Sequence, residues 1–172
     1  MANIKDLKKK IKSTKGTLKI TTAMKLVSAA KMAKAQASIT SSRPYATELE
    51  GTIKTISALV QNYSNKLLEP SKGDKTLVLI ISANKGLCGG FNAQLGKEIR
   101  RFIGEEEGEV KVSFIGKKLR DLFKGEFDEE VFYTFDANEG NYADIKKIGE
   151  DLCSDFLKNK YKKVYVAYNV FQ

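Results

Sequence analysis

The feature that most constrains this fold is a spacing of apolar residues, alternately three and four apart, through the first forty residues. Seven of the eleven positions in this register hold Ile, Leu, Met or Ala; the register comprises residues 4, 7, 11, 14, 18, 21, 25, 28, 32, 35 and 39. The spacing predicts one long helix with a coiled-coil seam. At 1.5 Å per residue, forty residues extend ~60 Å, which exceeds the width of a compact domain of this size. We therefore expect the helix to project.

The helical pattern continues beyond Pro44, where we expect the helix to be kinked or interrupted. Apolar residues resume there at helical spacing, at Leu49, Ile53, Ile56, Val60 and Tyr63. The segment Pro-Ser-Lys-Gly-Asp at residues 70–74 is the clearest linker in the chain. These signals predict two regions, a helical shaft region over residues 1–69 and a globular domain over residues 75–172.

The middle of the predicted helix is apolar around its whole circumference. The residues that produce this pattern are Ile20, Ala23, Met24, Leu26, Val27, Ala29 and Ala30. A helix that is apolar on every side is typically surrounded by other polypeptide, and its alanines permit close approach of a neighbouring backbone. The alternative is that alanine is abundant here because it is the best helix former.

The hydrophobic period changes after the linker. The β-branched run Thr76 to Ser82 predicts a central parallel strand buried on both faces. Alternating patterns follow: a helix through Leu95, Ile99, Phe102 and Ile103, a strand over 110–115, a helix over 117–123, a strand over 131–135, a helix over 141–157 and a strand over 164–170. The alternation predicts an α/β, Rossmann-like domain with a mostly parallel sheet.

Positive charge is concentrated at one end of the chain. Residues 1–43 contain eleven lysine and arginine residues and one acidic residue, Asp6, whereas the remainder contains nineteen basic and twenty acidic residues. Such a distribution implies an acidic partner for the N-terminal end. The candidate classes are a nucleic acid, an anionic lipid surface and an acidic protein loop.

The composition argues against chemistry carried out by this chain. It contains no histidine, which excludes Ser-His-Asp triads and imidazole metal sites, and its two cysteines are too few for a thiolate zinc site. We therefore expect no catalytic residue, metal or cofactor. The longest apolar run, Leu77 to Ile81, is far shorter than the ~20 residues of a spanning helix. The basic N-terminus has no apolar segment behind it, so we expect no secretory signal.

A glycine-rich loop follows the first predicted strand, where doubly wound folds place a ligand loop. Its segment Gly86 to Asn92 lacks both the dinucleotide fingerprint and the P-loop ending Gly-Lys-Ser/Thr. We expect its glycines to serve tight turns and close helix packing. Cys88 lacks an obvious general base, Cys153 is expected in the core, and the acidic run at residues 105–109 is expected to be a surface turn.

Long motifs give the sequence a specific resemblance. Lys19 to Lys31 (KITTAMKLVSAAK) and Gly86 to Asn92 (GLCGGFN) closely resemble the gamma-subunit family of F-type ATP synthases, as do Ile4 to Ser13 and the strand end Tyr168-Asn169. The resemblance covers the whole chain. Asn84-Lys85 departs from the Asp-Arg pair usual in the family, and lysine keeps the charge without the guanidinium fork.

The resemblance implies a rotor that couples rotation, driven by proton or sodium flow, to conformational changes in a catalytic ring. In the family, the N-terminal helix coils against a C-terminal helix inside a ring of alpha and beta subunits, which carries out the chemistry. The α/β body lies beside the epsilon subunit and above the membrane-embedded c-ring. This places the protein peripherally, on the cytoplasmic face of a bacterial membrane, without lipid insertion or nucleic acid. Because the second shaft helix is missing, we expect an N-terminal portion of a longer gene product; the alternative is a naturally short variant.

The candidate contact residues fall into two groups. Partner-binding positions on the helix, from the seam and from the resemblance, are Ile4, Leu7, Ile11, Leu18, Ile20, Met24, Lys25, Val27 and Lys31. The subunit-contact loop consists of Lys85, Gly86, Leu87, Cys88, Gly89, Gly90, Phe91 and Asn92. The main rival interpretation is a nucleic-acid-binding protein with a basic N-terminal helix, and a third is an enzyme whose glycine loop holds a nucleotide.

Overall fold

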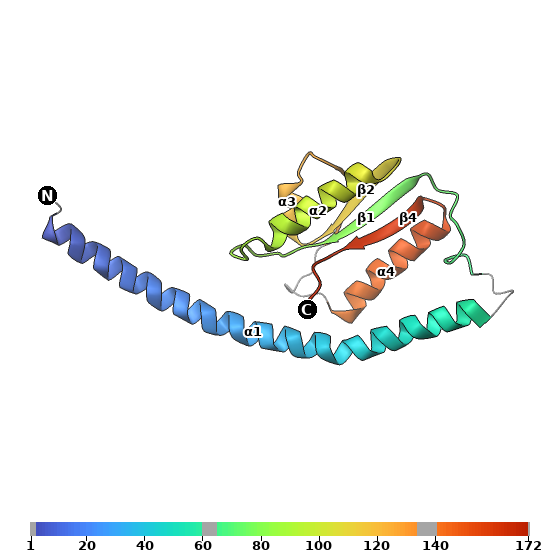
Figure 1. The fold of residues 1–172 in the computed structure, drawn as a ribbon. Coiled ribbons are helices and arrows are strands. Elements are labelled where there is room, and N and C mark those ends of the chain that lie inside the picture. Colours follow the sequence, from blue (N-terminus) through green and yellow to red (C-terminus); the bar gives the residue numbers. More distant parts are fainter. Residues whose placement is uncertain (1–2, 60–64, 134–140, 172) are drawn as a thin grey trace. The chain divides into compact units, whose positions relative to one another are not determined.

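The computed structural model describes residues 3–59, 65–133 and 141–171 of the chain. It divides into two compact units, residues 1–63 and residues 64–172, which are described separately below. The first unit is a single helix, and the second is an α/β domain (Figure 1).

The first unit consists of α1, Ile4–Leu59, a helix of 56 residues. The prediction of a long helix is confirmed, and at 1.5 Å per residue it extends ~84 Å. The helix is not interrupted at Pro44, which lies inside it, and Figure 1 shows one continuous, curved helix. Side-chain hydroxyls of Ser41 and Ser42 donate to the Ser38 carbonyl at 2.9 Å and 2.8 Å, and bonds of this kind often accompany bending of a helix.

The second unit contains a four-stranded parallel sheet in the order β3-β2-β1-β4. The strands are β1 (Lys75–Ile81), β2 (Glu109–Ile115), β3 (Asp128–Tyr133) and β4 (Tyr161–Ala167). The helices are α2 (Phe91–Glu105), α3 (Lys117–Leu122) and α4 (Tyr142–Leu157). Helices α2 and α3 lie on one face of the sheet and α4 lies on the other (Figure 1). The predicted α/β class with a parallel sheet is confirmed.

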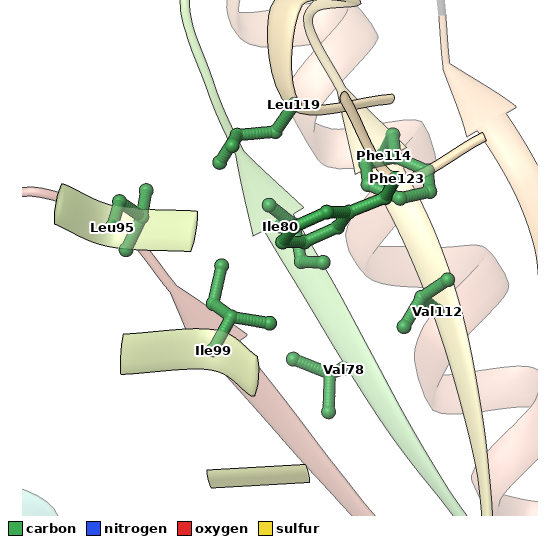
Figure 2. Packing of buried hydrophobic residues seen from close by; sticks show 8 residues of the cluster. All are labelled: Val78, Ile80, Leu95, Ile99, Val112, Phe114, Leu119 and Phe123. Atoms are coloured by element: carbon green, nitrogen blue, oxygen red, sulfur yellow. The ribbon is translucent and has the colours of Figure 1, made fainter. Parts of the chain in front are cut away.

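The central strand behaves as its sequence predicts, because all five residues from Thr76 to Ile80 are buried. On the α2 face, side chains from β1, β2, α2 and α3 converge on one core (Figure 2), composed of Val78, Ile80, Leu95, Ile99, Val112, Phe114, Leu119 and Phe123. Each fully buried aliphatic or aromatic side chain contributes about 1.5–3 kcal/mol by leaving water. This core fixes the position of the loop between β1 and α2.

The two edge strands begin earlier than predicted. β3 begins at Asp128 rather than residue 131, and β4 spans Tyr161–Ala167 rather than residues 164–170. β3 opens with three acidic residues, and in β4 the buried Tyr161 is followed by two exposed lysines. Charged residues of this kind are typical of sheet edges but hide a strand from a search for apolar runs. The predicted end of the third strand, at residue 135, lies outside the described residues.

Two smaller expectations about side chains need correction. Cys153 is exposed rather than buried in the core, because it lies about 100° around α4 from Leu152, which is half-buried. The acidic run is more than a surface turn. Its member Glu106 keeps only 11% of its side chain exposed, and its Oε1 lies 2.8 Å from Lys163 Nζ and 3.2 Å from the Thr76 hydroxyl.

Candidate partner-binding surfaces

Every described residue of α1 is exposed within the chain. The predicted seam is therefore fully accessible, with exposed fractions of 71% for Ile4, 49% for Leu7, 54% for Ile11 and 64% for Leu18. Apolar side chains on a helix are normally covered, since a helix of this kind gains little stability from propensity alone. An exposed apolar seam of this length is typical of helices that pack against a partner helix.

The stretch from Ile20 to Lys31 presents apolar side chains in every direction around α1. Ile20, Met24 and Val27 are 63%, 47% and 58% exposed, and Lys25 and Lys31 are exposed beside them. The threonine hydroxyls here bond back to the helix: Thr21 donates to the Thr17 carbonyl at 3.0 Å, and Thr22 to the Leu18 carbonyl at 2.8 Å. Their polar atoms are thus satisfied internally, which makes the helix surface smoother and more apolar than the sequence implies.

The glycine-rich loop between β1 and α2 is an ordered projection. Its tip is Leu87, which is 94% exposed and has φ 61°, a left-handed conformation unusual for a leucine; Gly89 has φ 56°. The side chain of Asn92 braces the loop from inside. Its Oδ1 accepts from the Ala83 amide at 3.2 Å, and its Nδ2 donates to Cys88 Sγ at 3.1 Å. The loop therefore presents an apolar tip on a rigid base.

Hydrogen bonds also join this loop to the first residues of α3. The Lys117 amide donates to Asn84 Oδ1 at 3.2 Å, and the Lys118 amide donates to the Ala83 carbonyl at 3.0 Å. The resemblance leads one to expect aspartate at position 84, and its carboxylate would accept the same bond. The departure at this position therefore preserves the structural role, while Lys85 is exposed and extends the positive surface.

The loop lies at the topological switch point of the sheet, because the chain passes from β1 to β2 on one side and β4 lies on the other. Doubly wound folds place ligands there, yet Asn92 fills the inner side of the loop with its own hydrogen bonds. Asn169, just after β4, donates its side-chain amide to the Phe91 carbonyl at 3.4 Å. The hydrogen bonds around the loop therefore also involve the segment that follows β4. The loop residues predicted from sequence thus divide into an exposed tip and a bracing interior.

A group of paired titratable side chains surrounds Lys160. Its Nζ lies 2.8 Å from Glu130 Oε1 and 3.0 Å from Asp155 Oδ2, and the hydrogen bond to Glu130 is the main cause of the raised pKa of Lys160. The lysine also lies 5.2 Å from the ring centroid of Tyr161. Because its charges are mutually paired, the cluster fastens β3, β4 and the end of α4 together.

Sequence reasoning missed one arrangement on α1. Lys8, Lys12, Lys15 and Lys19 line a groove of about 500 Å³ together with Ile11 and Gly16. The sequence signal for this arrangement is the spacing of these lysines at i, i+4, i+7 and i+11, which places them on one side of a helix and which net charge alone does not show. No described helix is both long and apolar enough to cross a bilayer.

The fold and these surfaces define a class of protein: a four-stranded parallel α/β domain preceded in the chain by a long helix with an exposed apolar seam. The comparisons with known proteins name the family. The family model for ATP synthase matches residues 3–172, so the chain belongs to this family. The relatives below are ATP synthase gamma chains.

The chain is 36% identical to the ATP synthase gamma chain of Geotalea uraniireducens over its whole length, and it covers 61% of that protein. It is 35% identical to the gamma chain of Christiangramia forsetii and 34% identical to that of Pelagibacter ubique, covering 61% and 62% of them. The chain thus spans about 61% of the length of its curated relatives. The comparisons give no support to the nucleic-acid interpretation.

Proposed function

We propose that this chain is part of the central-stalk rotor of an F-type ATP synthase, with α1 as one helix of the shaft. The observation that carries the proposal is α1 itself, a 56-residue helix with no buried residue and an exposed apolar seam. The apolar side chains of such a helix stabilise the folded state only when other polypeptides cover them. The relatives named gamma chains support the same assignment.

In the proposed assembly, the seam residues Ile4, Leu7, Ile11 and Leu18 pack against a second helix, supplied by the part of the family's length beyond this chain. The stretch from Ile20 to Lys31 turns inside a ring of alpha and beta subunits. Its Met24 and Lys25 lie near acidic loops at the base of the beta subunits. Shaft and α/β domain correspond to residues 1–69 and 75–172.

The proposed mechanism is mechanical. A stiff shaft with unequal faces presses successive ring subunits into different states, so the nucleotide affinity of each depends on the shaft angle, which is a coupling free energy. Ion pairs made by exposed lysines such as Lys25 contribute about 0–1 kcal/mol each, weak enough for the shaft to move past. The chemistry belongs to the ring, and this chain supplies no cofactor or catalytic group.

The α/β domain carries the remaining proposed contacts. The loop from Lys85 to Asn92 meets a neighbouring subunit through Leu87, whose 94% exposure on a braced base suits a defined contact. The epsilon subunit and the membrane c-ring are the proposed neighbours of this domain. The protein is then peripheral, held at the cytoplasmic face of a bacterial membrane by other subunits.

Co-expression with the alpha and beta subunits of the same organism tests the proposal. We expect the full gene product to elute with alpha and beta in one complex. A double substitution of Met24 and Val27 by aspartate places unpaired charges in the enclosed stretch and should abolish co-elution. The matched control substitutes Lys9 and Lys34 by glutamine, outside the proposed positions, which makes the same change in net charge and should retain co-elution. An unmodified chain that never co-elutes would contradict the proposal.

A further inference from the structure

We propose that the side chain of Asn159 clamps residues 71–73 onto the turn between α4 and β4, so that these residues are a fixed part of the α/β domain. Residues 71–73, called here the strap, have the composition of a free linker between the helix and the domain. The strap lies within the second unit, just before β1. The inference goes beyond the proposed function, because it holds whatever partners α1 has.

One oxygen atom of Asn159 holds two consecutive residues of the strap. The Lys72 amide donates to Asn159 Oδ1 at 3.1 Å, and the Ser71 hydroxyl donates to the same atom at 3.4 Å. Within the strap, the Gly73 amide donates to Ser71 Oγ at 3.2 Å. A side-chain carbonyl oxygen has two lone pairs, so Asn159 can accept both bonds at once. The three strap residues are therefore joined to the turn and to one another.

Gly73 lets the strap lie directly against the backbone of the turn. A Cβ atom at Gly73 would lie 2.5 Å from the carbonyl carbon of Tyr161 and 2.9 Å from the carbonyl oxygen of Asn159. Only a residue without a side chain can approach another backbone so closely. Ser71 and Gly73 are also half-buried, whereas Lys72 is exposed. One side of the strap thus faces the domain and the other faces solvent.

The turn that receives the strap is itself firmly held. Lys160 Nζ pairs with Glu130 Oε1 on β3 at 2.8 Å and with Asp155 Oδ2 on α4 at 3.0 Å. The next residue, Tyr161, is only 1% exposed. The strap is therefore clamped to a turn that is already fastened to two other elements of the domain.

Asn159 has a second, simpler role that must be separated from this one. Its φ is 59°, and its amide donates to the Phe156 carbonyl at 2.9 Å, an arrangement that commonly ends a helix. Glycine ends helices in this way at least as well as asparagine. What glycine lacks is the side-chain oxygen that the strap uses, so Asn159→Gly separates the two roles.

The position of the strap gives it a mechanical consequence. β1 begins at Lys75, which pairs with Glu109 of β2 and Tyr161 of β4. A pull on the chain from the side of α1 meets the clamped residues 71–73 before it meets this first pairing. The strap thereby shields the start of the central strand from movements of α1.

The test measures amide hydrogen exchange in the full chain by NMR, at Lys72 in the strap and at Val78 in β1. Asn159→Gly removes the acceptor and keeps the left-handed backbone. Asn159→Asp retains an acceptor oxygen and tolerates the same backbone. Asn169→Gly is the matched control, because it makes the same change at an asparagine that does not contact the strap.

We expect Asn159→Gly to speed exchange at Lys72 by about three- to tenfold, the effect of losing one hydrogen bond, and to leave Val78 unchanged. Asn159→Asp and Asn169→Gly should keep the slow exchange at Lys72. An unchanged rate at Lys72 in Asn159→Gly, or an equal acceleration in Asn159→Asp or Asn169→Gly, would overturn the inference. An equal acceleration at Val78 would also overturn it, because the whole domain would then be destabilised. The measurement needs neither alpha nor beta, so its result and that of the assembly test are independent.

Discussion

Lys163 on the edge strand β4 holds Glu106, at the end of α2, by a hydrogen-bonded ion pair of 2.8 Å. The pair links β4 to the C-terminal end of α2. The hydrogen bond from Lys163 is the main cause of the lowered pKa of Glu106. The pKa of Lys163 is raised in turn, chiefly by Glu106. The interaction explains why a glutamate in an acidic run is almost covered.

The pair predicts a specific pH dependence of folding. A lowered carboxyl pKa stabilises the folded state above the unfolded pKa of about 4.3, and this contribution is lost as the pH falls through the folded pKa. Glu106→Gln should therefore flatten the decline of stability below about pH 4.3, relative to the unmodified chain. Urea unfolding at a series of pH values measures it. Glu107→Gln, in an exposed neighbour, is the control, and identical slopes for the two variants would refute the assignment.

Substitution of Gly116, between β2 and α3, should lower the stability of the domain substantially. Its φ is +95°, and an added Cβ would collide with the Ser82 backbone carbonyl. We expect Gly116→Ala to destabilise the domain by about 1–3 kcal/mol or more. Gly149→Ala is the control, because a Cβ there meets nothing within 4 Å in a helix, and it should stabilise by about 1 kcal/mol. Denaturant unfolding compares the two, and an equal effect would contradict the described backbone.

We expect the side chain of Asn92 to hold the glycine-rich loop in its observed conformation. Asn92→Ala removes its bonds to the Ala83 amide and the Cys88 sulfur, so the loop should open and Cys88 should react faster with a thiol reagent. Cys153, exposed on α4, is an internal reference whose rate should not change. Asn92→Asp retains the acceptor and should give an intermediate rate. An unchanged Cys88 rate in the alanine variant would show that the loop holds without this side chain.

Met24 provides a functional prediction for the assembled enzyme. Met24→Lys places a second cation beside Lys25, which should over-tighten one angular position of the shaft against acidic loops. The activation energy of coupled turnover, measured over several temperatures, should rise. The control Met24→Leu conserves volume and charge and should match the unmodified enzyme. An unchanged temperature slope in the lysine variant would count against this contact.

The sequence predicts the buried parts of this fold better than its margins. Thr76 to Ile80 reads as a central strand because burial on both faces leaves an unbroken apolar run. Asp128 begins an edge strand with exposed acidic residues, and in β4 two exposed lysines follow the buried Tyr161, so neither strand starts with a continuous apolar run. Cys153 was misplaced because one position around a helix changes the side that a residue faces.

The candidate surfaces show the same division. The exposed seam and the tip at Leu87 follow from residue type and spacing. The bracing role of Asn92 depends on Ala83 and Cys88 coming together in space, and the pairing of Glu106 with Lys163 spans 57 positions. Such contacts arise from tertiary structure, which local patterns do not encode.

The central claim is that α1 is exposed in the isolated chain and enclosed in the assembled enzyme. The most direct measurement is maleimide labelling of Leu26→Cys in a background with Cys88 and Cys153 replaced by serine; Leu26 is 69% exposed. The account predicts fast labelling of the isolated chain and at least about tenfold slower labelling once alpha and beta are bound. Equal rates in both states, or protection already present in the isolated chain, would contradict it.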